Sequence, residues 1–177
     1  GADKLLNKPA SKLSPAEQAA ASGFKALVEN DLLTAGSMFE DALRRKPDFT
    51  VAMLGLADVR VRQRNTTQAE ANIRKALATE PANPDVHTAA GRLYMAMQKH
   101  PQAKAAYLKA IELDPQAVLA RLDLAELYAS VEKNPKAAIA EYRKAIEIKP
   151  DLASARMGLG MTLLATGDTK GAISELQ

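Results

Sequence analysis

The sequence contains no cysteine and no tryptophan among its 177 residues, and phenylalanine and tyrosine together account for only 4% of it. The absence of cysteine excludes disulfides, thiolate nucleophiles and Cys-ligated zinc or iron–sulfur sites. No apolar run approaches the ~18 residues that a membrane-spanning helix needs, so no direct insertion into a membrane is expected. Because β-sandwiches and β-barrels favour aromatic and β-branched residues, the scarcity of aromatics also argues against an all-β fold.

Alanine is abundant instead, with 35 copies in the chain. Alanine has the highest helix propensity of all residues, so the composition predicts an all-α protein. The 24 basic and 21 acidic residues leave a net charge of only +3. Such a weak excess of positive charge does not by itself predict a nucleic-acid partner.

Four prolines recur at intervals of 34, 34 and 35 residues, at Pro47, Pro81, Pro115 and Pro150. Each proline follows an alanine by five residues, a large apolar residue by eight and another alanine by twelve. The large residues are Phe39, Ile73, Tyr107 and Tyr142. This spacing follows the period of an α-helix, and proline ends such a helix. The pattern predicts one helix before each of these prolines.

A second helical stretch precedes each of these helices and contains a small residue at a fixed place. The small residues are Gly23, Ala57, Gly91, Ala125 and Gly160. They allow the two helices of a pair to approach closely, and the large residue of the other helix fills the remaining space. Because one pair cannot bury its apolar face alone, successive pairs are expected to stack.

The two stretches together resemble the 34-residue tetratricopeptide repeat (TPR), over about residues 15–177. The resemblance implies an all-α fold, a right-handed α-solenoid of stacked antiparallel helix pairs. The expected repeats are about 16–49, 50–83, 84–117, 118–152 and an incomplete 153–177. The sequence departs from the family pattern in two ways, since no repeat has the family's tryptophan and Arg60 stands where a tyrosine is expected.

Turn and capping residues agree with these boundaries. The run Ser14-Pro15-Ala16-Glu17 is a capping box, and Asp31 and Asp168 are further candidate helix N-caps. Repeat four is one residue longer than the others, and the extra residue falls in the turn at 131–135. Residues 1–14 are expected to be a flexible linker, although their two leucines could dock. Because the fifth repeat lacks a full second helix, the parent protein is expected to continue.

Sequence motifs for catalysis are missing. There is no phosphate-binding loop, no spaced glycine fingerprint and no Gly-x-Ser-x-Gly elbow. His87 and His100 lack the spacing of a metal-binding pair, and His87 is interpreted as a helix-packing residue. Asp123 and Glu126 share a helix face, but such a pair on a helical repeat is typically solvated or binds a partner. We therefore expect no enzymatic activity, no cofactor and no metal.

Two basic clusters could suggest nucleic-acid binding. Arg44, Arg45 and Lys46 end a predicted helix, where the helix dipole favours cations. Three further arginines, at positions 60, 62 and 64, are spaced by two residues and so do not share one helix face. Since the chain has few aromatic side chains to stack on bases, a nucleic-acid partner is not expected.

In the TPR family, the first helices of successive repeats line a concave groove that binds peptides or partner helices. Carrying the family's groove positions onto this sequence gives a candidate partner-binding set of Phe24, Leu54, Asp58, Arg62, Asp85, Arg92, Met95, Leu122, Glu126, Met157 and Met161. Its apolar members could form an exposed stripe, which would mark an interaction site. Alternatively, several of them pack between neighbouring first helices. Acidic residues outnumber basic ones in the set, so the expected partner is amphipathic or basic.

The resemblance thus implies a non-enzymatic scaffold that binds a peptide or helix of a partner protein. Two alternatives stay open. One is a self-association or assembly module of a larger protein, acting through the ends of the helix stack. The other is a regulatory array of an enzyme encoded outside this segment. The alanine-rich composition and the family's envelope-assembly members favour a bacterial periplasm or cell envelope over the cytoplasm.

Overall fold

The computed structural model describes all 177 residues. It consists of eleven α-helices and one short 3-10 helix joined by turns, and it contains no strand. The chain divides into two compact units, Gly1–Gln98 and Lys99–Gln177, which are called unit 1 and unit 2 below. The division falls inside the third expected repeat, 84–117.

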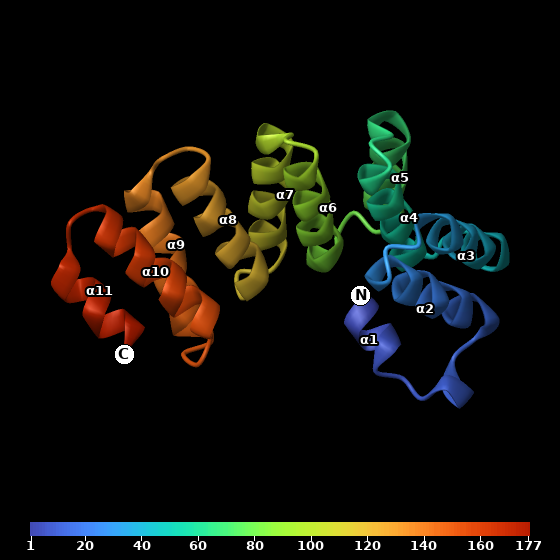
Figure 1. Cartoon of the computed structure of the whole chain (residues 1–177), viewed down its shortest axis with the longest axis horizontal. Helices are drawn as coiled ribbons and strands as arrows, with labels where there is room; N and C mark the ends of the chain where they lie inside the picture. The colour runs from blue at the N-terminus through green and yellow to red at the C-terminus, as the bar shows by residue number, and fades with distance from the viewer. The chain divides into compact units, whose positions relative to one another are not determined.

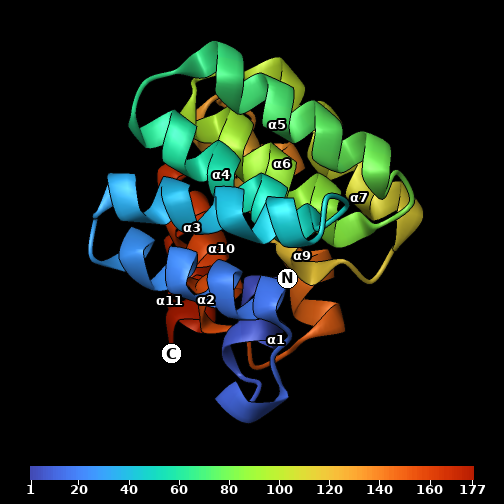
Figure 2. The same cartoon turned by 90° about the vertical axis from the view of Figure 1, so that its right-hand side faces the viewer.

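Unit 1 is built from stacked helix pairs (Figures 1 and 2). Its helices are α1 (Ala2–Leu6), α2 (Pro15–Val28), α3 (Leu32–Arg45), α4 (Thr50–Arg62), α5 (Thr66–Thr79) and α6 (Pro84–Ala96), with a 3-10 turn at Ala10–Lys12. α2 pairs with α3, and α4 pairs with α5. The two pairs stack through a contact of α3 with α4, and α6 packs against both helices of the second pair.

Unit 2 repeats the same construction. Its helices are α7 (His100–Leu113), α8 (Val118–Ser130), α9 (Pro135–Ile148), α10 (Ala153–Ala165) and α11 (Thr169–Leu176). α8 pairs with α9 and α10 with α11, while α9 contacts α10 and α7 packs on α8 (Figure 1). None of the helices in either unit combines the length and the apolar composition that a bilayer crossing requires. The all-α class and the stacked helix pairs predicted from the sequence are confirmed.

The core of each helix pair places one large side chain among small ones. Phe39 of α3 is fully buried, and its ring lies against the backbone of both Gly23 and Gly55. Phe24 meets the same ring edge-on, with 4.9 Å between the ring centroids. In unit 2, Tyr142 of α9 takes the place of Phe39 and lies against Gly158 of α10. The spacing between the two helices is therefore set by a large aromatic side chain on one helix and a glycine on the other.

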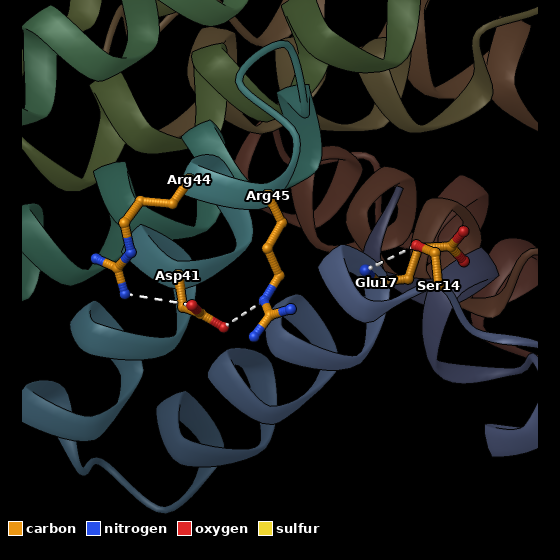
Figure 3. Close-up of polar contacts among 5 residues, drawn as sticks. All are labelled: Ser14, Glu17, Asp41, Arg44 and Arg45. Atoms are coloured by element: carbon orange, nitrogen blue, oxygen red, sulfur yellow. Dashed lines mark hydrogen bonds and ion pairs between the residues drawn. The ribbon is translucent and has the colours of Figure 1, made fainter.

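Short polar side chains begin the helices where the sequence predicts it. The hydroxyl oxygen of Ser14 accepts a hydrogen bond from the backbone N–H of Glu17 at 3.2 Å (Figure 3). Asp31 and Asp168 cap α3 and α11 in the same way, and Asn134 caps α9. These caps satisfy N–H groups that have no partner within the helix. The candidate caps at Ser14, Asp31 and Asp168 are confirmed.

The turn inside each helix pair has a left-handed residue. The positive φ angles belong to Asn30, Arg64, Gln98, Lys133 and Gly167. Glycine is the residue that takes this conformation without steric cost, yet only one of the five is glycine. The extra residue of repeat four lies in the turn between α8 and α9, so it lengthens that turn and leaves both helices of the pair intact.

The first fourteen residues differ from the flexible linker expected from their composition. Residues 2–6 form α1, which packs on α2, and Leu5 is only 6% exposed within the core of unit 1. The ammonium group of Lys8 lies 3.0 Å from a carboxylate oxygen of Glu17. Gln18 donates a hydrogen bond to the backbone oxygen of Leu13. Burial of a leucine and these two polar contacts hold the segment against the first helix pair.

Candidate partner-binding faces

Seven of the eleven candidate residues lie in unit 1, on the first helices α2, α4 and α6. The two apolar residues on α2 and α4, Phe24 and Leu54, are half-buried. Phe24 packs on Phe39, and Leu54 packs against a cluster that includes Met53 and Val86. These contacts match the alternative in which candidate residues pack between neighbouring helices. They leave Phe24 and Leu54 only part of their surface for a partner.

The charged candidates on α4 bind each other. The guanidinium Nε of Arg62 lies 3.0 Å from a carboxylate oxygen of Asp58, one helical turn away. Arg62 also donates a hydrogen bond to the backbone oxygen of Leu27 at the end of α2. The arginine therefore ties α4 to α2, so it has a structural role in addition to any role in binding.

The remaining candidates of unit 1 lie on α6. Asp85 is exposed in the first turn of the helix, where a negative charge is favourable. Arg92 is exposed about two turns further along the same face, and Met95 is half-buried near the end of the helix. The face of unit 1 is thus mixed in charge and has little exposed apolar surface among the candidates.

Unit 2 differs, because its candidates include long apolar side chains open to solvent. Met157 and Met161 of α10 are both 60% exposed. Leu164, one turn further along α10, and Leu119, on the neighbouring helix α8, are also exposed. Leu122 of α8 is half-buried against the core cluster of unit 2. Together with Glu126, these five residues form what is called here the α8–α10 face.

A polar group interrupts this apolar surface. Glu126 of α8 is exposed. Burial, and to a smaller extent the charge of Glu126, raises the pKa of the Tyr142 hydroxyl group. The Tyr142 hydroxyl oxygen lies 2.7 Å from the place that a Cβ at Gly158 would occupy, between Met157 and Met161 in the helix. The glycine therefore lets the end of the tyrosine reach α10.

Other charged groups of the sequence are paired within the molecule. Asp41 accepts hydrogen bonds from Arg44 and from Arg45, at 3.3 and 2.9 Å (Figure 3). The hydrogen bond from Arg45 is the main cause that lowers the pKa of the Asp41 carboxyl group. In the second basic cluster, Arg60 pairs with Glu40 of the neighbouring helix at 3.0 Å. Most of these arginines thus have carboxylate partners and do not form a continuous patch of unpaired cations.

Sequence reasoning missed a recurrent contact at the entrance of three repeats. His87, Arg121 and Arg156 each bond the backbone oxygen of the proline six residues earlier, at distances of 2.8 to 3.1 Å. Arg121 and Arg156 also pair with a glutamate of the second helix of their own pair, Glu141 and Glu175. The prediction that His87 is a structural residue fits this contact. The six-residue spacing from each proline can be found in the sequence. The hydrogen bond itself is recognised only in the structure, where the turn brings the side chain to the proline oxygen.

No group of three or more histidine, aspartate and glutamate side chains lies close enough together to hold a metal ion. The hollows of the surface are shallow. One is lined by Leu6 of α1 together with Phe24 and Val28 of α2, so the docked N-terminal segment forms one of its walls. The exposed candidates Met157 and Met161 lie on an open helix face.

Comparison with known proteins gives a consistent result. Two family models described as "Tetratricopeptide repeat" match the chain, one over residues 88–153 and the other over 26–93 and 60–109. Among curated proteins, "Cellulose synthase operon protein C" of Pseudomonas fluorescens (strain SBW25) is 30% identical over 95 residues, which is 54% of this chain. "Protein O-mannosyl-transferase TMTC3" of Homo sapiens is 25% identical over 130 residues, or 73% of this chain. The matched regions span only 7% and 14% of those two proteins.

Solved structures of similar fold include yeast Tom70, with a TM-score of 0.80 and 21% identity over 90% of this chain and 34% of that one. PilF of Pseudomonas aeruginosa has a TM-score of 0.78 and 19% identity, covering 99% of this chain and 75% of that one. YrrB, described as having an unusual peptide-binding site, has a TM-score of 0.61 and 20% identity, covering 89% and 81%. At these identities the likeness concerns the fold.

Proposed function

Because the chain belongs to the tetratricopeptide repeat family, we propose that it is a protein-interaction scaffold that binds a peptide or helix of a partner protein on its first-helix faces. It acts by binding and not by catalysis. The proposal draws support from the absence of catalytic motifs and from matches to repeat families that are generally non-catalytic. The transferase among the relatives is matched over only 14% of its length, so the proposal does not carry its activity over to this chain.

The observation that carries this proposal is the exposure of Met157 and Met161 on α10. A methionine that leaves most of its side chain in water loses hydrophobic stabilisation, so two of them one turn apart need an explanation. Methionine is flexible and adapts to irregular apolar partners. The adjacent exposed Leu164 extends the surface along the same side of the helix, since residues four and three apart share a helix face.

The test is affinity capture with the full chain as bait, from an extract of the organism that makes it. The variant Met157→Glu with Met161→Glu places charge on the proposed face. Both side chains are exposed, so the variant should keep the fold, which circular dichroism would verify. Leu33→Glu is the matched control, because Leu33 is 82% exposed on α3, a second helix of unit 1.

A protein held by the wild type and by Leu33→Glu, but lost by the double variant, is the expected result. If the double variant retains every protein that the wild type captures, the proposed binding face is wrong. The half-buried Leu54 and Leu122 are poorer probes, because a charge at either would disturb the core clusters that they pack against.

A second candidate function is self-association, which two other exposed side chains favour. Ile173 and Leu176 of α11 are 51% and 47% exposed on the last helix of unit 2. Sedimentation of the wild type and of Ile173→Lys would separate the candidates. A concentration-dependent dimer that Ile173→Lys abolishes supports self-association, whereas a monomer at all concentrations contradicts it.

A further inference from the structure

We propose that the α8–α10 face of unit 2 binds a basic amphipathic helix of a partner protein. A lysine or arginine of that helix lies against Glu126, which is exposed on α8. Its apolar side chains lie along Met157 and Met161. The inference rests on the proposed function and specifies the chemistry of the partner.

The first argument is the charge of the face. α8 and α10 contain only two basic residues, Arg121 and Arg156. Both are held by a proline backbone oxygen and by a glutamate of the paired helix. Neither guanidinium group is therefore available to balance Glu126. A partner that approaches this face meets a carboxylate for which it can supply the counter-charge.

The second argument is the place of that carboxylate within an apolar surface. Glu126 lies one turn from Leu122 on α8, and α8 contacts α10, the helix of Met157 and Met161. Polar groups inside an apolar rim give orientation and specificity, while the rim supplies most of the affinity.

The third argument is the spacing of the exposed apolar residues. Met157, Met161 and Leu164 are separated by four and three residues along α10, which is the spacing of one helix stripe. An apolar stripe of this kind is complementary to a second stripe with the same spacing, as when an amphipathic helix binds in a groove. The partner therefore needs apolar residues at helical intervals with a basic residue beside them.

Unit 1 shows a segment of this chemistry bound to a first helix. Residues 4–8 read Lys-Leu-Leu-Asn-Lys, and α1 within this region packs on α2. Leu5 is buried there, and Lys8 pairs with Glu17 of α2 at 3.0 Å. The hydrogen bond from Lys8 is the main cause that lowers the pKa of the Glu17 carboxyl group. On the α8–α10 face, a partner helix would supply an apolar residue and a lysine, as Leu5 and Lys8 do on α2 in unit 1.

The experiment uses the full chain and three fluorescein-labelled peptides of eighteen residues. The first places leucine and lysine in a helical period, the second replaces lysine by glutamate, and the third is a scramble of the first. Fluorescence anisotropy at near-physiological salt gives each affinity. The amphipathic lysine peptide is expected to bind at least about tenfold more tightly than the other two.

Variants locate the binding. Glu126→Gln should weaken binding of the lysine peptide by about threefold to tenfold, and Met161→Ser should weaken it by a similar factor. Glu147→Gln is the matched control, because Glu147 is an exposed glutamate on α9, the second helix of the same pair. It removes the same charge and should leave binding unchanged.

The inference is overturned if the glutamate peptide binds as tightly, if Glu126→Gln and Glu147→Gln behave alike, or if no peptide binds. These outcomes are separate from the capture experiment with the Met157 and Met161 double variant. If that variant loses a natural partner while the lysine peptide fails to bind, the proposed function stands and the basic chemistry is wrong. If the variant loses nothing and no peptide binds, both proposals fail.

Discussion

The aromatic ring of Phe39 occupies the space that a side chain at Gly55 would need. A Cβ at residue 55 would overlap the ring, and one at Gly23 would lie only 2.8 Å from it. The ring is therefore held between the backbones of two first helices. This contact joins the first helix pair of unit 1 to the second.

We expect Gly55→Ala to destabilise the protein by about 1–3 kcal/mol, because a methyl group forced into a filled core displaces the ring or the helix. Gly36→Ala is the control within the adjacent helix. A Cβ there would meet Val59 at an ordinary contact distance of 3.6 Å. Since alanine is the better helix former, this variant should be neutral or stabilising by up to about 1 kcal/mol. Urea denaturation of both variants would decide the point, and equal effects would contradict it.

Arg121 provides a second prediction, because it holds two acceptors at once. Its guanidinium group bonds the backbone oxygen of Pro115 and pairs with Glu141, and the arginine is only 9% exposed. Arg121→Met keeps the bulk of the side chain but leaves a carbonyl and a carboxylate without this donor. We expect a loss of about 1–3 kcal/mol of unfolding free energy.

An exposed ion pair serves as the comparison. Lys109 and Glu112 are 3.1 Å apart on α7, and both side chains are largely in solvent. Lys109→Met should change stability by no more than about 0.5 kcal/mol, because exposed ion pairs are weak. If the two substitutions have the same effect, the bridging role of Arg121 is wrong.

The left-handed turn residues give a third prediction, with opposite signs at two sites. Arg64 has a φ of 59° and Gly167 a φ of 87°. Arg64→Gly removes the steric cost of a side chain in this conformation and should stabilise the protein by about 0.5–1 kcal/mol. Gly167→Ala should destabilise it by a similar amount, although open space surrounds the added methyl group. Thermal melting curves of both variants would show whether the signs differ.

Acid stability supplies a fourth prediction. Hydrogen bonds from Thr34, first from its side chain and then from its backbone N–H, lower the pKa of the Asp31 carboxyl group below its usual 3.8. A group with a lowered pKa in the folded state stabilises the protein above its unfolded pKa. That contribution is lost as the pH falls through the folded value.

Asp31→Asn tests this directly, because asparagine also caps helices but does not titrate. The melting temperature of the wild type should exceed that of the variant at pH 7, and the difference should shrink below about pH 4. A difference that stays constant down to pH 2 would show that the charge of Asp31 does not contribute.

The helices and their order follow from the sequence because the signals are local and repeated. The proline at the end of each second helix and the caps such as Asp31 act within one or two turns of the chain, so spacing alone locates them. The small residue Gly23 and the large residue Phe39 predict which helices pair, because the ring fits only where the two helices lie close together at the glycine. Four copies of the same pattern made the stacking of pairs foreseeable.

Other features depend on contacts that spacing does not encode. Nothing in residues 1–14 has helical periodicity, and the burial of Leu5 becomes visible only when α2 is in place. The sequence also did not predict which of the candidate residues are exposed to solvent. Phe24 and Met161 occupy the same place in their repeats, but Phe24 is half-buried against Phe39 while Met161 is largely exposed. The contact of Phe24 with Phe39 is made across two helices, so the spacing of residues within one helix does not reveal it.

The fit between Phe39 and Gly55 also constrains how this gene segment can be rearranged. The same two places, sixteen residues apart, hold Phe39 and Gly55, Ile73 and Ala89, Tyr107 and Asp123, and Tyr142 and Gly158. A recombinant that joined the repeat containing Phe39 directly to the repeat containing Ala89 would place a methyl group where the ring requires none. The repeats share a length and an outline, but they are not interchangeable modules. In shuffled arrays, the repeats that contain Phe39 and Tyr142 should each be followed by a repeat with glycine at the matching place, as Gly55 and Gly158 are here.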